Sequence, residues 1–188
     1  MTYKDCIKIA SLYLDESDLY NYINEENAYA NAEIQQKIKY LCSCIDVITN
    51  EIACEYFPIK KKEKAIARNK QITYDSLSEY VLDVRYVKKN GRKVNYDLYS
   101  TAIEVDEDGE YEVCYEYTPK SYSGNVNEKI ELYGRITPRI VAIGAVAEYC
   151  LAFDRFDEAI TYDKMFKDAL VGVEKSRGKL RVRSRRWA

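Results

Sequence analysis

The sequence predicts an α+β protein: an antiparallel helical bundle from N- and C-terminal helix pairs, an inserted antiparallel β-hairpin region and a basic C-terminal arm. Apolar residues recur at helical spacing near both ends of the chain, and strand-like alternation with turn signals fills the middle. Helices with one apolar face must cover one another, so the two ends should pack together. The expected parts are residues 1–58 and 128–175 for the bundle, 59–127 for the β insertion and 176–188 for the arm.

The N-terminal part should begin with a short helix. Thr2 can cap it, with Asp5 three residues on, an arrangement close to a capping box. The helix should end near Asp15. Residues 15–29 are polar and rich in Tyr and Asn, so we expect them to form a loop.

A long second helix should run from about Asn31 to Tyr56 and end before Pro58, because the residue that precedes a proline avoids helical geometry. This is the most regular helical pattern in the chain. Its apolar positions are Ile34, Ile38, Leu41, Ile45, Ile48, Ile52 and Phe57. We expect four of these residues to pack on the C-terminal helices. The predicted core joins Ile38, Leu41, Ile45 and Ile48 to Ile143, Val146 and Phe166.

The β-rich middle should contain a hairpin at residues 81–98. Residues 81–87 alternate in polarity, and residues 92–98 can form the return strand. Asn90-Gly91 between them favours a type I′ turn, which needs positive φ at both positions.

A second hairpin is predicted from residues 101–105 and 110–118, with Asp108-Gly109 at its turn. Short strands are also expected at 64–68 and 71–74. The three lysines at 60–62 follow Pro58, and we interpret them as a solvated loop, with a phosphate contact as the alternative.

Residues 119–127 should form a polar loop, and residues 128–133 a short helical segment. Thr137 followed by Pro138 predicts a helix start, since Thr caps free amides and Pro suits the first helical position. This helix should be buried because it is apolar on almost every side.

The last helix should pair with it as an antiparallel neighbour across a short join at Phe153-Asp154. Asp154 is the expected cap, with Asp157 and Glu158 in the first turn, where carboxylates suit the helix dipole. An apolar stripe then continues to about Lys175.

The arm is the candidate functional site. Residues 179–185 alternate with a period of two, so that basic residues would share one face and Leu180, Val182 and Ser184 the other. A lone strand is unstable, so we expect the arm to be disordered in the isolated chain and ordered only against another protein. The predicted partner-binding residues are Lys179, Leu180, Arg181, Val182, Arg183, Arg185, Arg186 and Trp187.

Charge is unevenly distributed along a chain whose formal net charge is only −2. Residues 104–116 are strongly acidic, whereas the arm is strongly basic. One explanation is self-association, in which the arm of one copy meets the acidic stretch of another. The alternative is that both segments are merely solvated.

Composition excludes several kinds of chemistry. The chain has no histidine, which excludes Ser-His-Asp and Cys-His nucleophiles and His-ligated metals. Its six cysteines lack a Cys-x-x-Cys pair, so we predict no zinc, no disulfide, no cofactor and no enzymatic activity, although carboxylates or a lysine can catalyse without histidine. No apolar run can span a bilayer and the N-terminus lacks a signal peptide core, so we expect a cytoplasmic protein without membrane contact.

Four short motifs in the C-terminal part of the chain resemble motifs of a known protein family. They are Gly134-Arg135-Ile136-Thr137-Pro138-Arg139-Ile140, Ala147-Glu148-Tyr149-Cys150, Asp157-Glu158-Ala159 and Arg183-Ser184-Arg185-Arg186-Trp187. Together with the order helix–helix, β insertion, helix–helix and basic arm, they resemble the head–tail connector (adaptor) proteins of tailed phages and prophages. The likeness in order covers most of the chain but is specific only from about residue 134 onward. The β insertion is longer than in the simplest members.

The resemblance implies a structural virion protein in the neck of a phage, assembled in the bacterial host cytoplasm. It would form a ring of about twelve copies between the portal and the tail, lining a channel through which DNA passes. The arm would face the portal or bridge to a neighbouring subunit, and the β region would face a tail or neck protein or a neighbour.

Two other functions compete with this one. The stronger is a nucleic-acid-binding protein whose basic arm clamps phosphates, which predicts strongly salt-dependent DNA affinity. The weaker is a small enzyme that uses carboxylates, which predicts a pair of acids with perturbed pKa values in a pocket.

Overall fold

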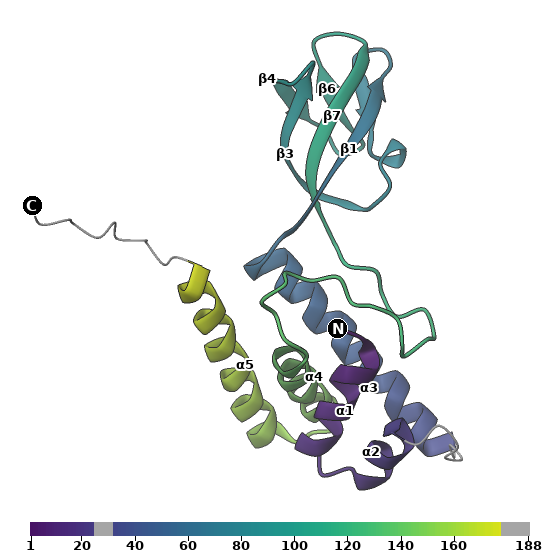
Figure 1. Ribbon diagram of the computed structural model, residues 1–188, viewed down its shortest axis with the longest axis vertical. Helices are drawn as coiled ribbons and strands as arrows, with labels where there is room; N and C mark the ends of the chain where they lie inside the picture. The colour runs from purple at the N-terminus through teal and green to yellow at the C-terminus, as the bar shows by residue number, and fades with distance from the viewer. Residues whose placement is uncertain (25–31, 178–188) are drawn as a thin grey trace, which may run out of the picture. The chain divides into compact units, whose positions relative to one another are not determined.

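The computed structural model describes residues 1–24 and 32–177, with the backbone alone for residues 176 and 177. As predicted, the fold is α+β: helices α1–α3 and α4–α5 pack together, and antiparallel strands β1–β7 are inserted between them in sequence (Figure 1). The chain divides into two compact units. The helical unit comprises Met1–Ile48, Tyr122–Ile130 and the described residues from Gly134 on, and the β unit comprises Thr49–Ser121 and Glu131–Tyr133.

Helix α1 spans Tyr3–Tyr13, and its N-terminus confirms the predicted capping box. The Thr2 hydroxyl accepts the Asp5 N–H at 3.2 Å, and the Thr2 N–H donates to the Asp5 carboxylate at 2.8 Å. Two of the amides that a helix start leaves unpaired are therefore satisfied reciprocally.

Helix α2, Ser17–Asn24, stands where we predicted a loop over residues 15–29, so that prediction is wrong for residues 17–24. Residues 25–29 lie outside the described part of the chain. Leu19 and Ile23, one helical turn apart, are both buried, and this burial outweighs the polar composition of the segment. Asp15, at φ +57°, makes the sharp turn between α1 and α2.

Helix α3 spans Ala32–Glu51 and continues as a π-helical turn over Ile52–Tyr56, which confirms the predicted long helix. The predicted start at Asn31 falls outside the described residues. The π turn closes where the Phe57 N–H donates to the Ile52 carbonyl at 2.7 Å, five residues back. Pro58, which follows at once, has no N–H to continue the helix.

Helices α4, Pro138–Ala152, and α5, Phe156–Arg177, form the predicted antiparallel pair, and Pro138 occupies the first helical position of α4. Two predictions beside them are wrong. Asp154 does not cap α5, because it lies at φ +58° in the turn and α5 begins only at Phe156. Residues 128–133 are not helical. Lys129 instead forms a bridge to Thr2, and the Ile130 N–H donates to the Met1 carbonyl at 3.0 Å.

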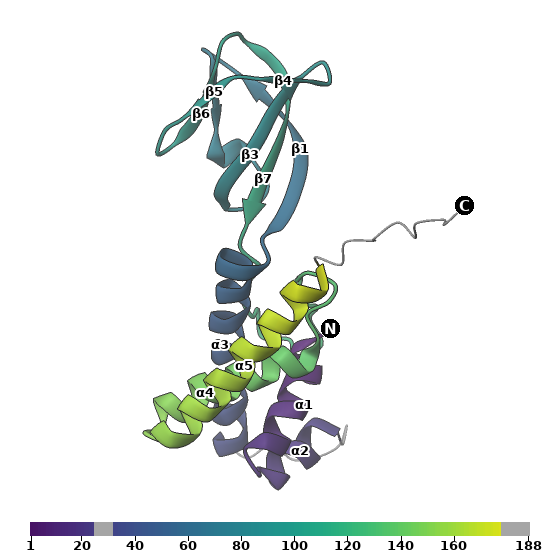
Figure 2. The same cartoon turned by 90° about the vertical axis from the view of Figure 1, so that its left-hand side faces the viewer.

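The β unit holds two antiparallel sheets (Figures 1 and 2). The first has the order β1-β7-β3-β4, formed by Ile59–Ala67, Gly109–Tyr117, Val81–Lys89 and Arg92–Val94. The second has the order β2-β6-β5, formed by Gln71–Thr73, Ala102–Val105 and Tyr96–Leu98. The β3–β4 hairpin is confirmed, with Asn90 at φ +51° and Gly91 at φ +79°.

Three β predictions need correction. The predicted return strand 92–98 is two strands, β4 and β5, which belong to different sheets. The predicted hairpin of residues 101–105 with 110–118 does not form, because β6 pairs with β2 and β5 while β7 pairs with β1 and β3. The lysines at 60–62 are not a loop but part of β1, in register with Glu116, Tyr115 and Cys114 of β7, respectively. Lys60 pairs with the cross-strand Glu116 at 3.7 Å, and Lys62 lies over the Tyr86 ring, contacts that favour lysines in a strand.

Each unit has its own core. In the helical unit the seven residues predicted to meet are all buried: Ile38, Leu41, Ile45, Ile48, Ile143, Val146 and Phe166. Gly144 shows how closely α3, α4 and α5 approach one another. A Cβ placed on it would lie 2.9 Å from Ile48 Cγ2 and 3.0 Å from Phe166. The β core lies between the two sheets. It consists of Ala65, Ala67, Ile72, Leu77, Val84, Val87, Ile103, Val105, Tyr111, Val113, Tyr115 and Tyr117.

The loop predicted at 119–127 is irregular, and its helical-unit part is anchored to α3. The Asp46 carboxylate accepts the Tyr122 N–H at 3.0 Å and the Tyr3 hydroxyl. The Tyr3 and Tyr122 rings lie 5.1 Å apart. Burial raises the pKa of Tyr3, so its hydroxyl remains protonated and able to donate. One carboxylate thus ties α1, α3 and the loop together.

The pKa of Tyr117 leads to a prediction about alkaline stability. Burial and the Glu131 carboxylate, which accepts its hydroxyl at 3.0 Å, raise the pKa of Tyr117 from 10.0 to about 12. The native state therefore holds this proton more tightly than the unfolded chain does. Its contribution to stability is complete below pH 10 and is lost as pH rises through 12. The free energy of unfolding, measured with urea, should fall between pH 9 and pH 11. We expect this fall to be about 1 kcal/mol smaller in Tyr117→Phe than in the unmodified protein. Parallel pH profiles for the two proteins would contradict this.

Candidate interaction surface

The residues predicted to bind a partner all lie in the arm, outside the described residues. They are Lys179, Leu180, Arg181, Val182, Arg183, Arg185, Arg186 and Trp187. Helix α5 extends to Arg177, so the first two residues of the predicted arm, 176 and 177, belong to the helix and the remaining arm residues follow it in sequence. The surface of the α4–α5 pair is consequently the part of the fold nearest to these arm residues along the sequence.

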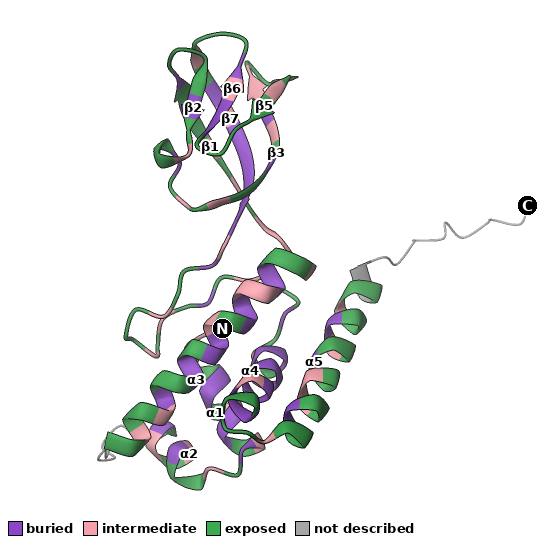
Figure 3. Ribbon diagram, turned by 180° about the vertical axis from the view of Figure 1, so that it is seen from behind, coloured by how far each residue is buried: buried purple, intermediate pink, exposed green. Residues whose placement is uncertain are grey.

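The two helices of this pair differ sharply in burial (Figure 3). Helix α4 is apolar on most sides and is buried along much of its length, in accord with its predicted place in the core. Helix α5 covers only one side of it. Among its described side chains only Ala159, Phe166 and Leu170 are buried, and most of the rest of the helix faces solvent.

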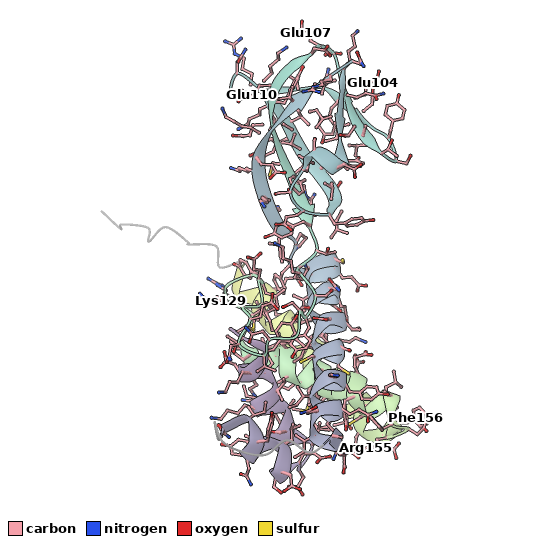
Figure 4. All side chains as sticks on the ribbon, turned by 90° about the vertical axis from the view of Figure 1, so that its right-hand side faces the viewer. Glu104, Glu107, Glu110, Lys129, Arg155 and Phe156 are labelled. Atoms are coloured by element: carbon pink, nitrogen blue, oxygen red, sulfur yellow. The ribbon has the colours of Figure 1, made fainter. Side chains whose placement is uncertain are left out.

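Large apolar side chains are exposed around the α4–α5 turn. Leu151 is 51% exposed, Phe153 46%, Phe156 55% and Ile160 69%. Figure 4 shows Phe156 and its neighbour Arg155 directed outward at this turn. We call Leu151, Phe153, Phe156 and Ile160 the hairpin patch. Exposed apolar residues are ordinary when they are scattered, but four of them around one turn are a candidate contact surface.

Aromatic contacts extend this surface onto α3. The Phe153 ring lies 4.5 Å from that of Tyr149 and 5.6 Å from that of Tyr40, measured between ring centroids. Tyr40 is itself 45% exposed. Phe153 therefore packs against two aromatic rings, one from α4 and one from α3.

A shallow groove of about 230 Å³ lies between α4 and α5 beside the patch. Its lining is Ala147, Glu148, Leu151, Ala159, Ile160 and Asp163. The two helices thus contribute apolar side chains to the floor and one carboxylate each. Asp163 pairs with Lys167 at 2.8 Å, whereas Glu148 has no ion-pair partner among the described residues. The groove suits an apolar segment that also carries positive charge.

The acidic stretch at 104–116 is largely neutralised inside the β unit. Glu107 pairs with Lys89 at 2.7 Å, and Glu116 pairs with Arg85 at 2.6 Å. Glu110 and Glu112 pair with lysines of β1 and β3, and the Asp108 carboxylate accepts the Lys70 N–H at 2.6 Å. Internal pairing explains this run of acids, so it is a weaker candidate for the arm of another copy than the groove.

Lysines surround Tyr86 on the first sheet. The ammonium groups of Lys88, Lys93 and Lys62 lie 4.8, 5.3 and 6.0 Å from its ring centroid. Such a group of cations around an aromatic ring is a possible phosphate contact. Glutamates of β7 share this sheet, which limits the positive potential that the lysines can create.

The carboxylates considered for catalysis do not form an acid–base pair. Asp157 and Glu158 line a hollow of about 420 Å³ with Tyr13 and Met165. However, the Arg155 guanidinium, 2.8 Å from Glu158, lowers the pKa of that carboxyl, whereas a general acid needs it raised. A second hollow, of about 580 Å³, contains Glu79, which pairs with Lys61 at 3.1 Å.

The cysteines are structural. All six are free thiols, and Cys54 alone of them is exposed. Burial raises the pKa of the Cys6 and Cys42 thiols to about 12, which leaves them unreactive at neutral pH. No cluster of three or more Cys, Asp or Glu side chains suited to a metal ion occurs in residues 1–24 and 32–175.

Comparison with known proteins finds no match to a protein-family model and none to a curated protein. In the part of the chain that the structure describes, no helix is both long enough and apolar enough to cross a bilayer.

Sequence reasoning missed the hairpin patch. The helical spacing places Ile160 in the apolar stripe of the last helix, which predicts burial, and Phe153 lies in the predicted join between the helices. One signal was available. Phe156 and Ile160 are apolar, lie one helical turn apart and stand beside the short turn that joins the two helices.

Proposed function

We propose that this chain is a structural subunit of a tailed-phage head–tail connector. It forms a ring between the portal and the tail and lines the channel through which DNA passes. The observation that carries this proposal is the hairpin patch, because four large apolar side chains exposed around one turn favour contact with another protein. A ring provides that contact in every subunit, since each copy presents the patch to its neighbour.

Three further observations support the same function. The motifs from Gly134 onward resemble those of connector proteins, and the helical pair that contains them carries the patch. The arm that follows α5 adds a basic segment suited to a portal, a neighbouring subunit or the DNA backbone. In the two hollows described above, Glu158 is paired with Arg155 and Glu79 with Lys61, an arrangement that suits a structural role better than acid–base catalysis.

The test is the mass of the assembly with and without a portal protein. We expect multi-angle light scattering and electron microscopy of the full chain to give a closed ring of about twelve copies on the portal. The control is Phe156→Ser, which should keep the helical content and lose the ring. A protein that stays monomeric at every concentration and does not bind the portal would remove the basis of this proposal.

One observation favours a second function, nucleic-acid binding. The lysines around Tyr86, together with the basic arm, form two positive segments in one chain. A DNA-binding protein would bind duplex DNA as a monomer or dimer, with an affinity that falls steeply with salt. Filter binding at increasing salt distinguishes the two functions, since a channel lining should bind DNA weakly and without sequence preference.

A further inference from the structure

We propose that the groove between α4 and α5, rimmed by Glu148 and Asp163, is the docking site for the basic arm of a second copy of this chain. This inference rests on the proposed function, because it names the contact by which one subunit of the ring holds the next. The groove is defined by Ala147, Glu148, Leu151, Ala159, Ile160 and Asp163.

The chemistry of the groove matches the sequence of the arm. The floor is apolar, and Ile160 is 69% exposed in the absence of an occupant. The arm supplies Leu180 and Val182, two positions apart, which lie on the same side of an extended segment. Burying two such side chains is a substantial apolar gain for a short segment.

Charge on the two partners is complementary. The arm carries Arg181, Arg183 and Arg185 between and after its apolar residues. Glu148 has no ion-pair partner among the described residues, so it can accept a guanidinium without losing an existing contact. In an extended segment these arginines point away from the floor, and their long side chains can bend back to bring the guanidinium to a carboxylate at the rim.

The length of the chain decides that the occupant is a second copy. Ile160 lies about 25 Å from Arg177 along α5, at 1.5 Å per helical residue. Val182 is five residues beyond Arg177 and reaches at most about 17 Å in a fully extended chain. Leu180 is closer still. An arm therefore cannot place these residues at Ile160 of its own chain, but it can place them there on a neighbour.

The experiment uses the full chain with a photo-reactive residue in the arm. Val182 is replaced by p-benzoylphenylalanine, and isotopically heavy and light copies are mixed, assembled on the portal and irradiated. We expect cross-links between heavy and light copies, mapped to residues 147–163. Ile160→Arg should reduce their yield by about tenfold or more, and Glu148→Arg should reduce it several-fold. The matched control is Leu12→Arg on α1, where the leucine is 63% exposed, and it should leave the yield unchanged. Circular dichroism checks that each variant folds.

Four outcomes overturn the proposal: cross-links within one copy, cross-links to residues outside the groove, no cross-link between copies, or a yield that Ile160→Arg does not lower. The proposed function is tested separately, by whether a ring forms on the portal. If cross-links through the groove form without a ring, the connector function fails and the arm contact stands. If a ring forms while the cross-links lie elsewhere, the connector function stands and the proposed arm contact fails.

Discussion

Replacing Ile45 by alanine should destabilise the helical unit by roughly 2–5 kcal/mol, the usual cost of such a truncation in a tightly packed core. Ile45 is fully buried on α3, between the buried Leu41 and Ile48. About one turn away on α3 lies Ile48. A Cβ on Gly144 would lie 2.9 Å from Ile48 Cγ2 and 3.0 Å from Phe166, and this close packing limits how far the helices can move to fill a cavity. A cavity at Ile45 should therefore remain open, which places the cost in the upper part of the range.

The measurement is urea unfolding followed by far-ultraviolet circular dichroism. Val47→Ala is the matched control, because Val47 lies on the same helix, is also β-branched and is 51% exposed. Its effect should remain within about 0.5 kcal/mol. Equal effects of the two substitutions would mean that α3 does not form the core of this unit.

The parts of the fold that the sequence predicted are those that local patterns determine. The apolar stripe on α3 from Ile38 to Ile48 predicts a core helix, since no other segment repeats apolar residues so regularly. Asn90-Gly91 and the Thr2–Asp5 capping box depend on backbone geometry within a few residues. Tertiary context could not readily change any of the three.

The wrong predictions concern segments whose structure depends on pairing or packing with residues distant in sequence. Residues 101–105 and 110–118 look like a hairpin around Asp108-Gly109, but β7 has alternating side chains that fit between β1 and β3. The lysines at 60–62 look like a loop in sequence, but they pair with Glu116, Tyr115 and Cys114 of β7, and Lys60 forms an ion pair with Glu116. Helix α2 is polar except where Leu19 and Ile23 meet the rest of the unit. None of these partners is adjacent in sequence.

The candidate site divides in the same way. The arm was found from its alternation of charge and its tryptophan, which are properties of the segment alone. The groove that we propose as its receptor depends on α5 covering only one side of α4, which leaves Ile160 and Leu151 uncovered. An apolar residue in a helix predicts burial, and only the packing shows which residues the single chain leaves exposed.

Deleting residues 179–188 should abolish assembly of the chain onto the portal while leaving the melting temperature of the helical unit nearly unchanged. The deleted residues begin after α5 ends at Arg177, and no described core residue lies among them. Ordering each residue of a lone extended segment costs about 1–2 kcal/mol in backbone entropy, with no ladder hydrogen bonds to offset it. The arm should therefore add little to the stability of the isolated chain.

Its contribution should arise on assembly, where a neighbour supplies the apolar floor and the carboxylates that the arm lacks by itself. The measurement joins purified heads to tails with the intact and the deleted chain, and compares their melting curves. A variant with Leu180→Ser and Val182→Ser keeps every positive charge and should fail almost as completely as the deletion, because burial of apolar side chains drives the contact. If this variant assembles and only removal of the arginines prevents joining, the arm acts through charge alone and binds phosphate or acidic side chains instead. A deleted chain that still joins heads to tails, or an arm that resists protease in a dispersed monomer, would show that the arm is not the connecting element.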